Sequence, residues 1–436
     1  MPALNTDVLL DIMAVSDRSV ISRLMQTSRL FVETGAKHLL DEKSIRLHTE
    51  RDLDSFVDFL ATRQGYRIHF LRGLGLEMQV LKPSVAKRLD SLFNKHASQI
   101  SITLLYIRFV DSLLYPWVFF AGTFTRLTTI EESKIKTAVL EWILPPDLDP
   151  LQFPEQVVVE EDARNAILAL RTFQSSLKIL KTNRGQLQRF DGDNTFDEVY
   201  TGVTELSCNN IMVDSMSTVA IARAFPNLKV FSMVKNRTWM EDREELDRQH
   251  EKNVSEQTRE GSWKSLRLFA ARLNDLYVLS PICHIHGIHV AGPKMHVRSL
   301  RRILKRTRPL QLSLLEYEGN LFTPGLTEML RKPCVEQVEC LEVILQIGQT
   351  LAPELIDGEA MVESWVTGIS GLPRLRVLSL GLFCTLARTS SPDSASSHAE
   401  VFLMKLDLDV LMQRCKKRLH EFLVVIVKQP QQPQRL

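Results

Sequence analysis

The chain contains two kinds of segment that differ in the spacing of their hydrophobic residues. In one kind an apolar residue occupies every second position, as in a half-buried β-strand. In the other the apolar residues lie three or four positions apart, as in an amphipathic helix. From about residue 60 onward the two kinds alternate. We therefore expect an α/β fold in which helices connect the strands of a parallel sheet.

The strand segments share a more specific spacing, with apolar residues at positions i, i+3 and i+5, which places side chains on the inner face of a short strand. Two copies, 228–236 and 266–274, also carry Asn at i+8, where an amide can satisfy backbone groups in a turn. Copies without this Asn begin at Val203, Ile285, Val338, Leu375 and Leu419, and fainter ones begin at Phe124 and Leu177. Helices are expected between them at 215–225, 298–306, 323–330 and 359–369.

This spacing resembles the leucine-rich repeat. The resemblance implies parallel strands that stack into a solenoid and present their outer face to a target protein. Because the copies are unevenly spaced, we expect an irregular leucine-rich-repeat-like solenoid over residues 46–428, with loops inserted between repeats. The alternative is a large α/β domain in which a leucine-rich sequence matches the spacing by chance.

The N-terminal residues form a different pattern, that of short helices. Apolar residues at helical spacing begin at Leu4, and Asn5 can cap the first helix. Asp17 can cap a second helix that we expect to end at Gly35, and a third short helix is expected from Ala36 to about residue 40. A bundle of this size is close to the lower limit for an independent core, so we expect it to pack against a partner.

Residues 4–13, 17–25 and 27–31 of this bundle resemble the F-box. The sequence departs from the family's pattern at Asn5, where Pro is usual, and in lacking a Trp at the end. The resemblance implies that residues 1–45 form a helical module that docks on a Skp-type adaptor, which in turn binds a cullin. The residues expected to form the bundle and the adaptor contact are Leu4, Val8, Leu9, Ile12, Val20, Ile21, Leu24 and Leu30. The alternative is a generic three-helix cap on a larger domain.

Composition and charge narrow the function classes. With 44% hydrophobic residues the chain can bury a large core, which excludes a wholly disordered protein. Its 54 basic and 52 acidic residues nearly cancel, so no overall field attracts nucleic acid or an anionic membrane. The start lacks a secretory signal pattern, and the longest uncharged apolar stretch, 112–125, is too short to cross a bilayer. We expect an intracellular protein, in the cytoplasm or nucleus, without membrane or nucleic-acid partners.

Three segments are expected to lack regular structure. Residues 241–261 are densely charged with scarcely an apolar residue, and residues 387–399 are rich in Ser. Residues 429–436 form a tail of Pro and Gln that we expect to be disordered.

The strongest ligand-like cluster is Cys283, His284, His286 and His289, which offers four zinc donors within seven residues. A tetrahedral site requires the chain to turn back on itself, which a strand does not do. We therefore favour histidines at the start of a strand, with His289 on its exposed face, and we expect the six cysteines to be small core residues. Phosphate-loop, dinucleotide, esterase and zinc-protease motifs are missing from the sequence, so we predict no metal, no cofactor and no catalytic residue.

A basic run occupies the helix expected at 298–306. Its members are Arg298, Arg301, Arg302, Lys305, Arg306 and Arg308. Such a run can bind phosphate groups or serve as a nuclear import signal, but we favour the solvated outer face of a repeat helix.

The two resemblances together imply a non-catalytic substrate-recognition subunit of an SCF-type ubiquitin ligase. Its F-box module would dock on the Skp-type adaptor, and its repeats would hold an unidentified target protein. The chain would contribute proximity and orientation rather than bond chemistry. The alternative function is a leucine-rich-repeat interaction scaffold without a ligase role, and an enzyme is the least favoured class because the catalytic motifs are missing.

Overall fold

A computed structural model of the 436-residue chain provides the fold. It describes residues 5–41, 45–77, 83–96, 99–110, 135–143, 165–183, 197–211, 216–233, 242–292, 296–318, 324–347, 366–386 and 421–430, and the single positions 185, 187, 363 and 413. The chain divides into two compact units, one of residues 1–207 with 223–227 and one of residues 208–222 with 228–436. Strand β6 (Glu205–Asn209) and helix α8 (Thr218–Ala224) lie at the boundary.

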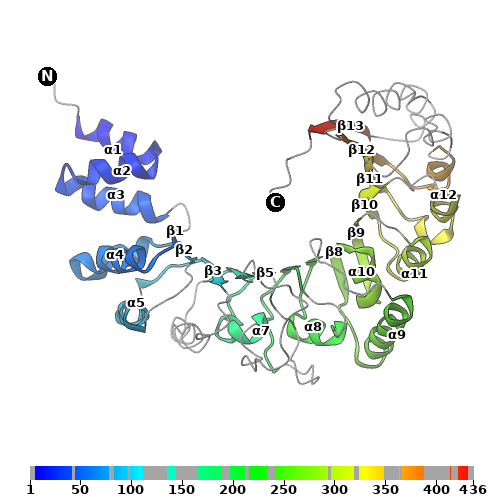
Figure 1. Ribbon diagram of the computed structural model, residues 1–436, viewed down its shortest axis with the longest axis horizontal. Helices are drawn as coiled ribbons and strands as arrows, with labels where there is room; N and C mark the ends of the chain where they lie inside the picture. The colour runs from blue at the N-terminus through cyan, green and yellow to red at the C-terminus, as the bar shows by residue number, and fades with distance from the viewer. Residues whose placement is uncertain are drawn as a thin grey trace. The chain divides into compact units, whose positions relative to one another are not determined.

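Three helices that pack side by side open the first unit (Figure 1). They are α1 (Thr6–Val15), α2 (Arg18–Met25) and α3 (Arg29–Asp41). Both predicted caps are confirmed: the Asn5 side chain accepts a hydrogen bond from the Asp7 N–H at 3.1 Å, and the Asp17 carboxylate accepts from Ser19 and Val20. The hydrogen bonds from the N–H of Val20 and from Ser19 lower the pKa of Asp17.

The prediction that Gly35 ends the second helix is wrong. The chain turns at residues 26–28 instead, and α3 passes through Gly35 without interruption. A Cβ atom at Gly35 would lie 2.5 Å from Cγ of Met25 and 3.3 Å from Cγ2 of Ile21, both on α2. The glycine therefore allows α2 and α3 to approach closely, and its role is packing rather than helix termination.

The sheet of the first unit is parallel, and its strands pair in their order along the chain. The strands are β1 (Ile45–Leu47), β2 (Gly73–Leu76), β3 (Leu104–Val110), β4 (Thr137–Ile143) and β5 (Ile179–Asn183). The helical segments are α4 (Glu50–Ala61), η1 (Thr62–Phe70), α5 (Pro83–Lys95), α7 (Ala166–Ala169) and η5 (Arg171–Phe173). One inner row of the sheet, fully or almost fully buried, runs through Leu47, Leu76, Ile107 and Leu140.

Of the strands in this first sheet, only β5 coincides with a copy predicted above, the faint one that begins at Leu177. The same apolar spacing occurs at β2, β3 and β4, beginning just before each strand at Leu71, Ile102 and Ile135, although no copy is predicted there. The other faint copy, at Phe124, lies outside the described residues.

The second unit also has a parallel sheet with strands in chain order. Its strands are β7 (Val230–Met233), β8 (Ser265–Arg272), β9 (His284–Ala291), β10 (Gln311–Glu318), β11 (Cys340–Ile347), β12 (Val377–Leu386) and β13 (Glu421–Pro430). Its helical segments are α9 (Arg243–Glu260), α10 (Leu273–Leu279), α11 (Val297–Thr307), α12 (Pro324–Leu330) and η7 (Pro333–Val335). Helices α10, α11 and α12 lie on one side of strands β8 to β11 (Figure 1). None of the described helices is long and apolar enough to span a membrane.

Burial in the second unit confirms the predicted spacing. Position i+3 of the copies that begin at 228, 266, 285, 338 and 375 lies in a fully buried row that includes Phe231, Phe269, Ile288, Leu341 and Leu378. Position i+5 lies in a second buried row that includes Met233, Ala271, Val290, Val343 and Leu380. Strand β10 adds Leu312 and Leu314 to these rows but has Pro309 at position i, so the spacing does not predict it.

The prediction of an α/β protein with a parallel sheet is therefore confirmed. The helices expected at 215–225, 298–306 and 323–330 are present as α8, α11 and α12, whereas most of 359–369 lies outside the described residues. The solenoid and F-box parts of the fold prediction, and the domain boundary near residue 45, stay predictions.

The prediction that residues 241–261 lack regular structure is wrong. They contain α9, a helix of 18 residues whose first turn is capped by Asp242, which accepts a hydrogen bond from the Glu244 N–H at 3.0 Å. The buried residues of α9 are Leu246, His250, Asn253 and Gln257. Because three of these four are polar, a search for apolar periodicity does not detect the face on which α9 packs.

Two smaller predictions also need correction. Asn274 lies inside α10 rather than in a turn, and Asn236 lies outside the described residues. Strand β13 extends through Gln429 to Pro430, so the predicted tail begins two residues too early. Residues 431–436 and the predicted loop 387–399 lie outside the described residues.

Candidate functional site

The three N-terminal helices share a small hydrophobic core. Met13, Ile21 and Phe31, one from each helix, are buried at its centre. The partly buried residues packed against them are Leu9, Leu10, Leu24, Met25 and Leu39. Of the residues predicted for this module, Leu9, Ile21 and Leu24 thus hold the helices together.

Other residues predicted for the module face the solvent. Val8 is 43% exposed, Ile12 39% and Leu30 46%. Val20 is half-buried, and Leu4 lies outside the described residues. Of the residues predicted for the bundle and the adaptor contact, some therefore lie in the core of the three helices and others on their surface. The contact with the adaptor stays a prediction.

Val8, Ile12 and Val15 form an apolar stripe along α1, here called the α1 stripe, because residues four and three positions apart share one face of a helix. Val15, which the F-box resemblance does not single out, is 86% exposed. In the described part of the chain six large apolar side chains are exposed, and four of them belong to α1 and α3. Exposed apolar surface concentrated on one small bundle indicates a protein-binding surface.

The outer face of the first unit's sheet carries a row of charged residues. The Glu77 carboxylate lies 3.0 Å from Arg46, 3.4 Å from His48 and 3.7 Å from Arg108. The Glu77 side chain is only 5% exposed, whereas the three basic side chains are 40–60% exposed. The row continues to Glu141, which lies 3.6 Å from Arg108. Donor groups therefore face the solvent, and the carboxylates beneath hold them in position.

Tyr106 is fixed in the same face by neighbours on both sides. Its hydroxyl donates a hydrogen bond to Glu141 at 2.6 Å, and the Arg46 guanidinium lies over its ring at 5.0 Å. Gly75, which lies between Arg46 and Tyr106 in the strand register, has no side chain to separate them. Burial and the hydrogen bond to Glu141 raise the pKa of Tyr106 to about 12, so the phenol is neutral at pH 7. Fixed Arg and Tyr side chains are typical of protein-binding surfaces.

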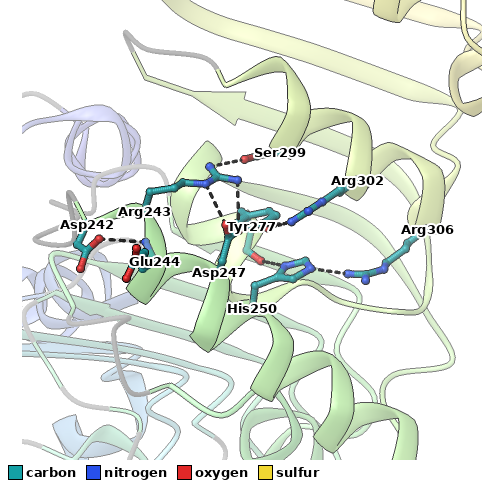
Figure 2. Close-up of polar contacts among 9 residues, drawn as sticks. All are labelled: Asp242, Arg243, Glu244, Asp247, His250, Tyr277, Ser299, Arg302 and Arg306. Carbon is teal, nitrogen blue, oxygen red and sulfur yellow. Dashed lines mark hydrogen bonds and ion pairs between the residues drawn. The ribbon is translucent and has the colours of Figure 1, made fainter.

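In the second unit a polar cluster joins α9, α10 and α11 (Figure 2). Asp247 is central: it accepts hydrogen bonds from the Tyr277 hydroxyl and from Arg243 at 3.3 Å, and lies 3.4 Å from Arg302. Arg243 also donates to the Ser299 hydroxyl at 2.9 Å. The hydrogen bond from Tyr277 is the main cause of the lowered pKa of Asp247. We call these residues the Asp247 cluster.

His250 is buried next to the Asp247 cluster, and its tautomer follows from its contacts. Nδ1 lies 2.7 Å from the backbone oxygen of Tyr277, which only accepts, so Nδ1 carries the proton. Nε2 lies 3.0 Å from Nη1 of Arg306, which only donates, so Nε2 is unprotonated. The imidazole is therefore neutral, and burial lowers its pKa in agreement with this.

Acidification is expected to destabilise the protein through His250. Its folded pKa lies below the ordinary value of 6.5, because of burial and the positive charges of Arg306 and Arg302, which outweigh the hydrogen bond to Tyr277 and the attraction of Asp247. Between the folded pKa and about 6.5 the unfolded chain binds more protons, so the free energy of unfolding falls as the pH drops below about 6.5. Urea unfolding at about pH 7.5 and about pH 5.5 measures the effect. The decrease should be smaller in His250→Gln, and an equal decrease in both proteins would contradict this assignment.

The prediction that the basic run is a solvated face is wrong for two of its residues. Arg302 belongs to the Asp247 cluster, and Arg306 donates to His250 and, at 2.8 Å, to the Ser280 hydroxyl. The side chains of the remaining members are exposed and make no hydrogen bond or ion pair with another described residue: Arg298, Arg301, Lys305 and Arg308.

The histidine cluster is spread along β9. His284 is exposed, and His289 is half-buried rather than exposed, with its pKa lowered by burial. Cys283 is buried, which raises the pKa of its thiol to about 11. Among the described residues, no three His, Cys, Asp or Glu side chains lie close enough together to hold a metal ion. Cys208 is also buried, as predicted for a core cysteine, whereas Cys334 and Cys340 are half-buried.

No protein-family model matches the chain, and no curated protein is significantly similar to it. Function is therefore argued from the surfaces above and from the resemblances in the sequence.

The sequence patterns miss several residues of these surfaces. His250, Asn253 and Gln257 follow one another at i, i+3 and i+7, a helical spacing of side chains that both donate and accept. This spacing is the feature of the sequence from which a polar packing face on this helix could have been predicted. Glu77 and Glu141 offer no local signal, because their partners Arg46 and Arg108 lie on other strands.

Proposed function

We propose that the chain is a substrate-recognition subunit of an SCF-type ubiquitin ligase. The N-terminal helices dock on a Skp-type adaptor, which binds a cullin, and the α/β units hold a target protein. The chain is a non-catalytic subunit that raises the local concentration of the target near the ligase and orients it.

The α1 stripe is the observation that carries the proposal. Val8 and Ile12 are among the residues that the F-box resemblance implies for the adaptor contact, and both are exposed beside a small core built on Met13. Burying one such apolar side chain contributes about 1.5–3 kcal/mol relative to leaving it in water. A partner that covers the stripe therefore stabilises a bundle too small to bury it internally.

The outer sheet face around Glu77 supports the second half of the proposal. Tyr106 is held by its hydrogen bond to Glu141, and Arg46 and Arg108 lie beside the carboxylates of Glu77 and Glu141, so these side chains lose less freedom on binding than unpaired ones would. We propose that this face contacts the target.

Loss of the adaptor contact in Val8→Asp/Ile12→Asp tests the proposal. Two carboxylates on the α1 stripe would be buried without partners in the complex, so we expect adaptor binding to fall at least about tenfold. Co-purification of the full chain with a purified Skp-type adaptor measures this. The matched control is Val199→Asp, at an exposed valine outside the helices, which should bind as the wild type does.

A second variant separates loss of binding from loss of folding. Val15 is 86% exposed, so Val15→Asp leaves the core of the three helices intact and should still weaken the adaptor contact. Wild-type chain that does not bind the adaptor, or stripe variants that bind it as well as Val199→Asp does, would overturn the proposal. The first of these results would favour a scaffold without a ligase role.

A further inference from the structure

The outer face of α11 is entirely basic. Every exposed position from residue 298 to residue 308 is Arg or Lys, and the helix has no carboxylate. The buried side of α11 consists of Ser299, Leu300, Ile303, Leu304 and Thr307. Because the whole chain has a formal net charge of only +2, six basic residues on one helix face are a strong local concentration.

Two of these six exposed basic side chains are held in position by residues of neighbouring helices. Nη1 of Arg302 contacts Tyr277 and Asp247, and Nη1 of Arg306 contacts His250 (Figure 2). Nη1 of Arg306 also contacts the Ser280 hydroxyl. Nε and Nη2 of both arginines make no hydrogen bond with a described residue. Since His250 is neutral, it orients Arg306 without cancelling its charge. The two guanidinium groups are therefore ordered before binding and keep donors for a ligand.

Two carboxylates that act on this face, Asp247 and Glu328, are shared with basic side chains outside it. The Asp247 carboxylate is shared between Arg243 and Arg302. On α12, Glu328 pairs with Lys332 at 2.7 Å, and this pair is the main cause of its lowered pKa, to which the charges of Arg301 and Arg331 add. The face therefore keeps an excess of positive charge that an anionic partner would satisfy.

We propose that the outer face of α11 binds a short acidic segment, rich in Asp or Glu, of a partner protein. Residues 298–308 rise about 15 Å along the helix, which matches an extended segment of about five residues. Carboxylates fit this surface because guanidinium groups bind them through two parallel hydrogen bonds. The site is distinct from the α1 stripe and does not depend on the adaptor contact.

Other anionic partners fit this surface less well. Proteins bind a bilayer surface or unpaired bases with exposed apolar or aromatic side chains. In the described part of the chain, α11 exposes no large apolar side chain, so these two partners fit it less well. Helix α9, joined to α11 through Arg243 and His250, carries exposed Glu244 and Glu251 beside exposed Arg248 and Lys252. It therefore does not extend the positive face for a long polyanion such as a nucleic-acid duplex.

Binding of fluorescein-labelled hexaglutamate to the full chain, measured by fluorescence anisotropy, tests the proposal. We expect binding at about 50 mM salt that weakens at about 300 mM salt. Arg301→Gln/Lys305→Gln, at two exposed side chains that make no hydrogen bond or ion pair with a described residue, should weaken binding about tenfold. The matched control, Lys252→Gln/Lys264→Gln, removes the same charge elsewhere in this unit and should stay within about twofold of wild type.

Three outcomes would overturn the proposal. Hexaglutamate that does not bind would exclude an acidic peptide site. Equal losses in the two double variants would show that only the net charge of the chain matters. Tighter binding of a DNA duplex of about 20 base pairs, or of phosphatidylserine vesicles, would assign the face to another class of partner. Unchanged urea midpoints of both variants establish that the proteins are folded.

Discussion

Asn253→Ala is expected to lower the free energy of unfolding by about 3 kcal/mol. The Asn253 side chain is buried on α9, where its carbonyl accepts from the Thr218 N–H at 2.9 Å and its amide donates to the backbone oxygens of Met216 and Val278 at 3.1 and 3.0 Å. Alanine leaves three backbone groups without these partners. Each unsatisfied buried polar group costs about 1–3 kcal/mol, and water that enters the space left by the side chain reduces the total cost for the three groups.

The large expected effect reflects how α9 is attached. The last carbonyls of a helix have no partner within it, and at the end of α10 they are satisfied by α9 side chains. His250 binds the backbone oxygen of Tyr277, Asn253 that of Val278, and Gln257 those of residues 279 and 280 at 3.2 and 3.1 Å. Helix α9 is thus held mainly by hydrogen bonds from its side chains to the backbone of α10, whereas most helices are held by apolar packing.

Urea unfolding of Asn253→Ala measures the prediction. The matched control is Lys252→Ala, the exposed neighbour on the same helix, which should change the free energy of unfolding by less than about 0.5 kcal/mol. A similar small change for Asn253→Ala would mean that the hydrogen bonds at the end of α10 contribute little to stability.

Phe269→Ala is expected to lower the free energy of unfolding by about 4 kcal/mol, within the range of about 3–5 for a buried Phe. Phe269 on β8 is fully buried and stacks on Phe231 of β7, with ring centres 4.9 Å apart and planes at 20°. Phe231 in turn contacts Trp263 at 6.0 Å. Alanine leaves a cavity in the row that continues through Ile288, and it removes the aromatic contact.

Two further variants at β8 make this prediction specific. Phe269→Leu fills most of the cavity and is expected to cost about 1.5 kcal/mol. Ser265→Ala, at the exposed start of the same strand, should stay within about 0.5 kcal/mol of wild type. If Phe269→Ala cost no more than Phe269→Leu, the ring would not be part of a close-packed core.

The candidate surfaces differ in how far they follow from sequence. The stripe of Val8 and Ile12 is predictable, because both belong to one helical face and to the F-box resemblance. The separation into exposed Ile12 and buried Met13 is not, because it depends on how α1 contacts α3. The basic run is also visible in the sequence, but only the contacts with α9 reveal which of its members are held in place.

The sequence by itself predicts the strands of the second unit except β10, and it predicts helices α11 and α12 between them, because alternating apolar side chains have only one face that can exclude water. Local caps such as Asn5 and Asp17 are likewise determined by neighbouring residues. Only the tertiary structure decides that Gly35 lies inside a helix, because its effect comes from the approach of α2. The same is true of α9 and of the row around Glu77, because the polar partners involved lie about 25–40 residues apart in sequence and meet only when the strands align.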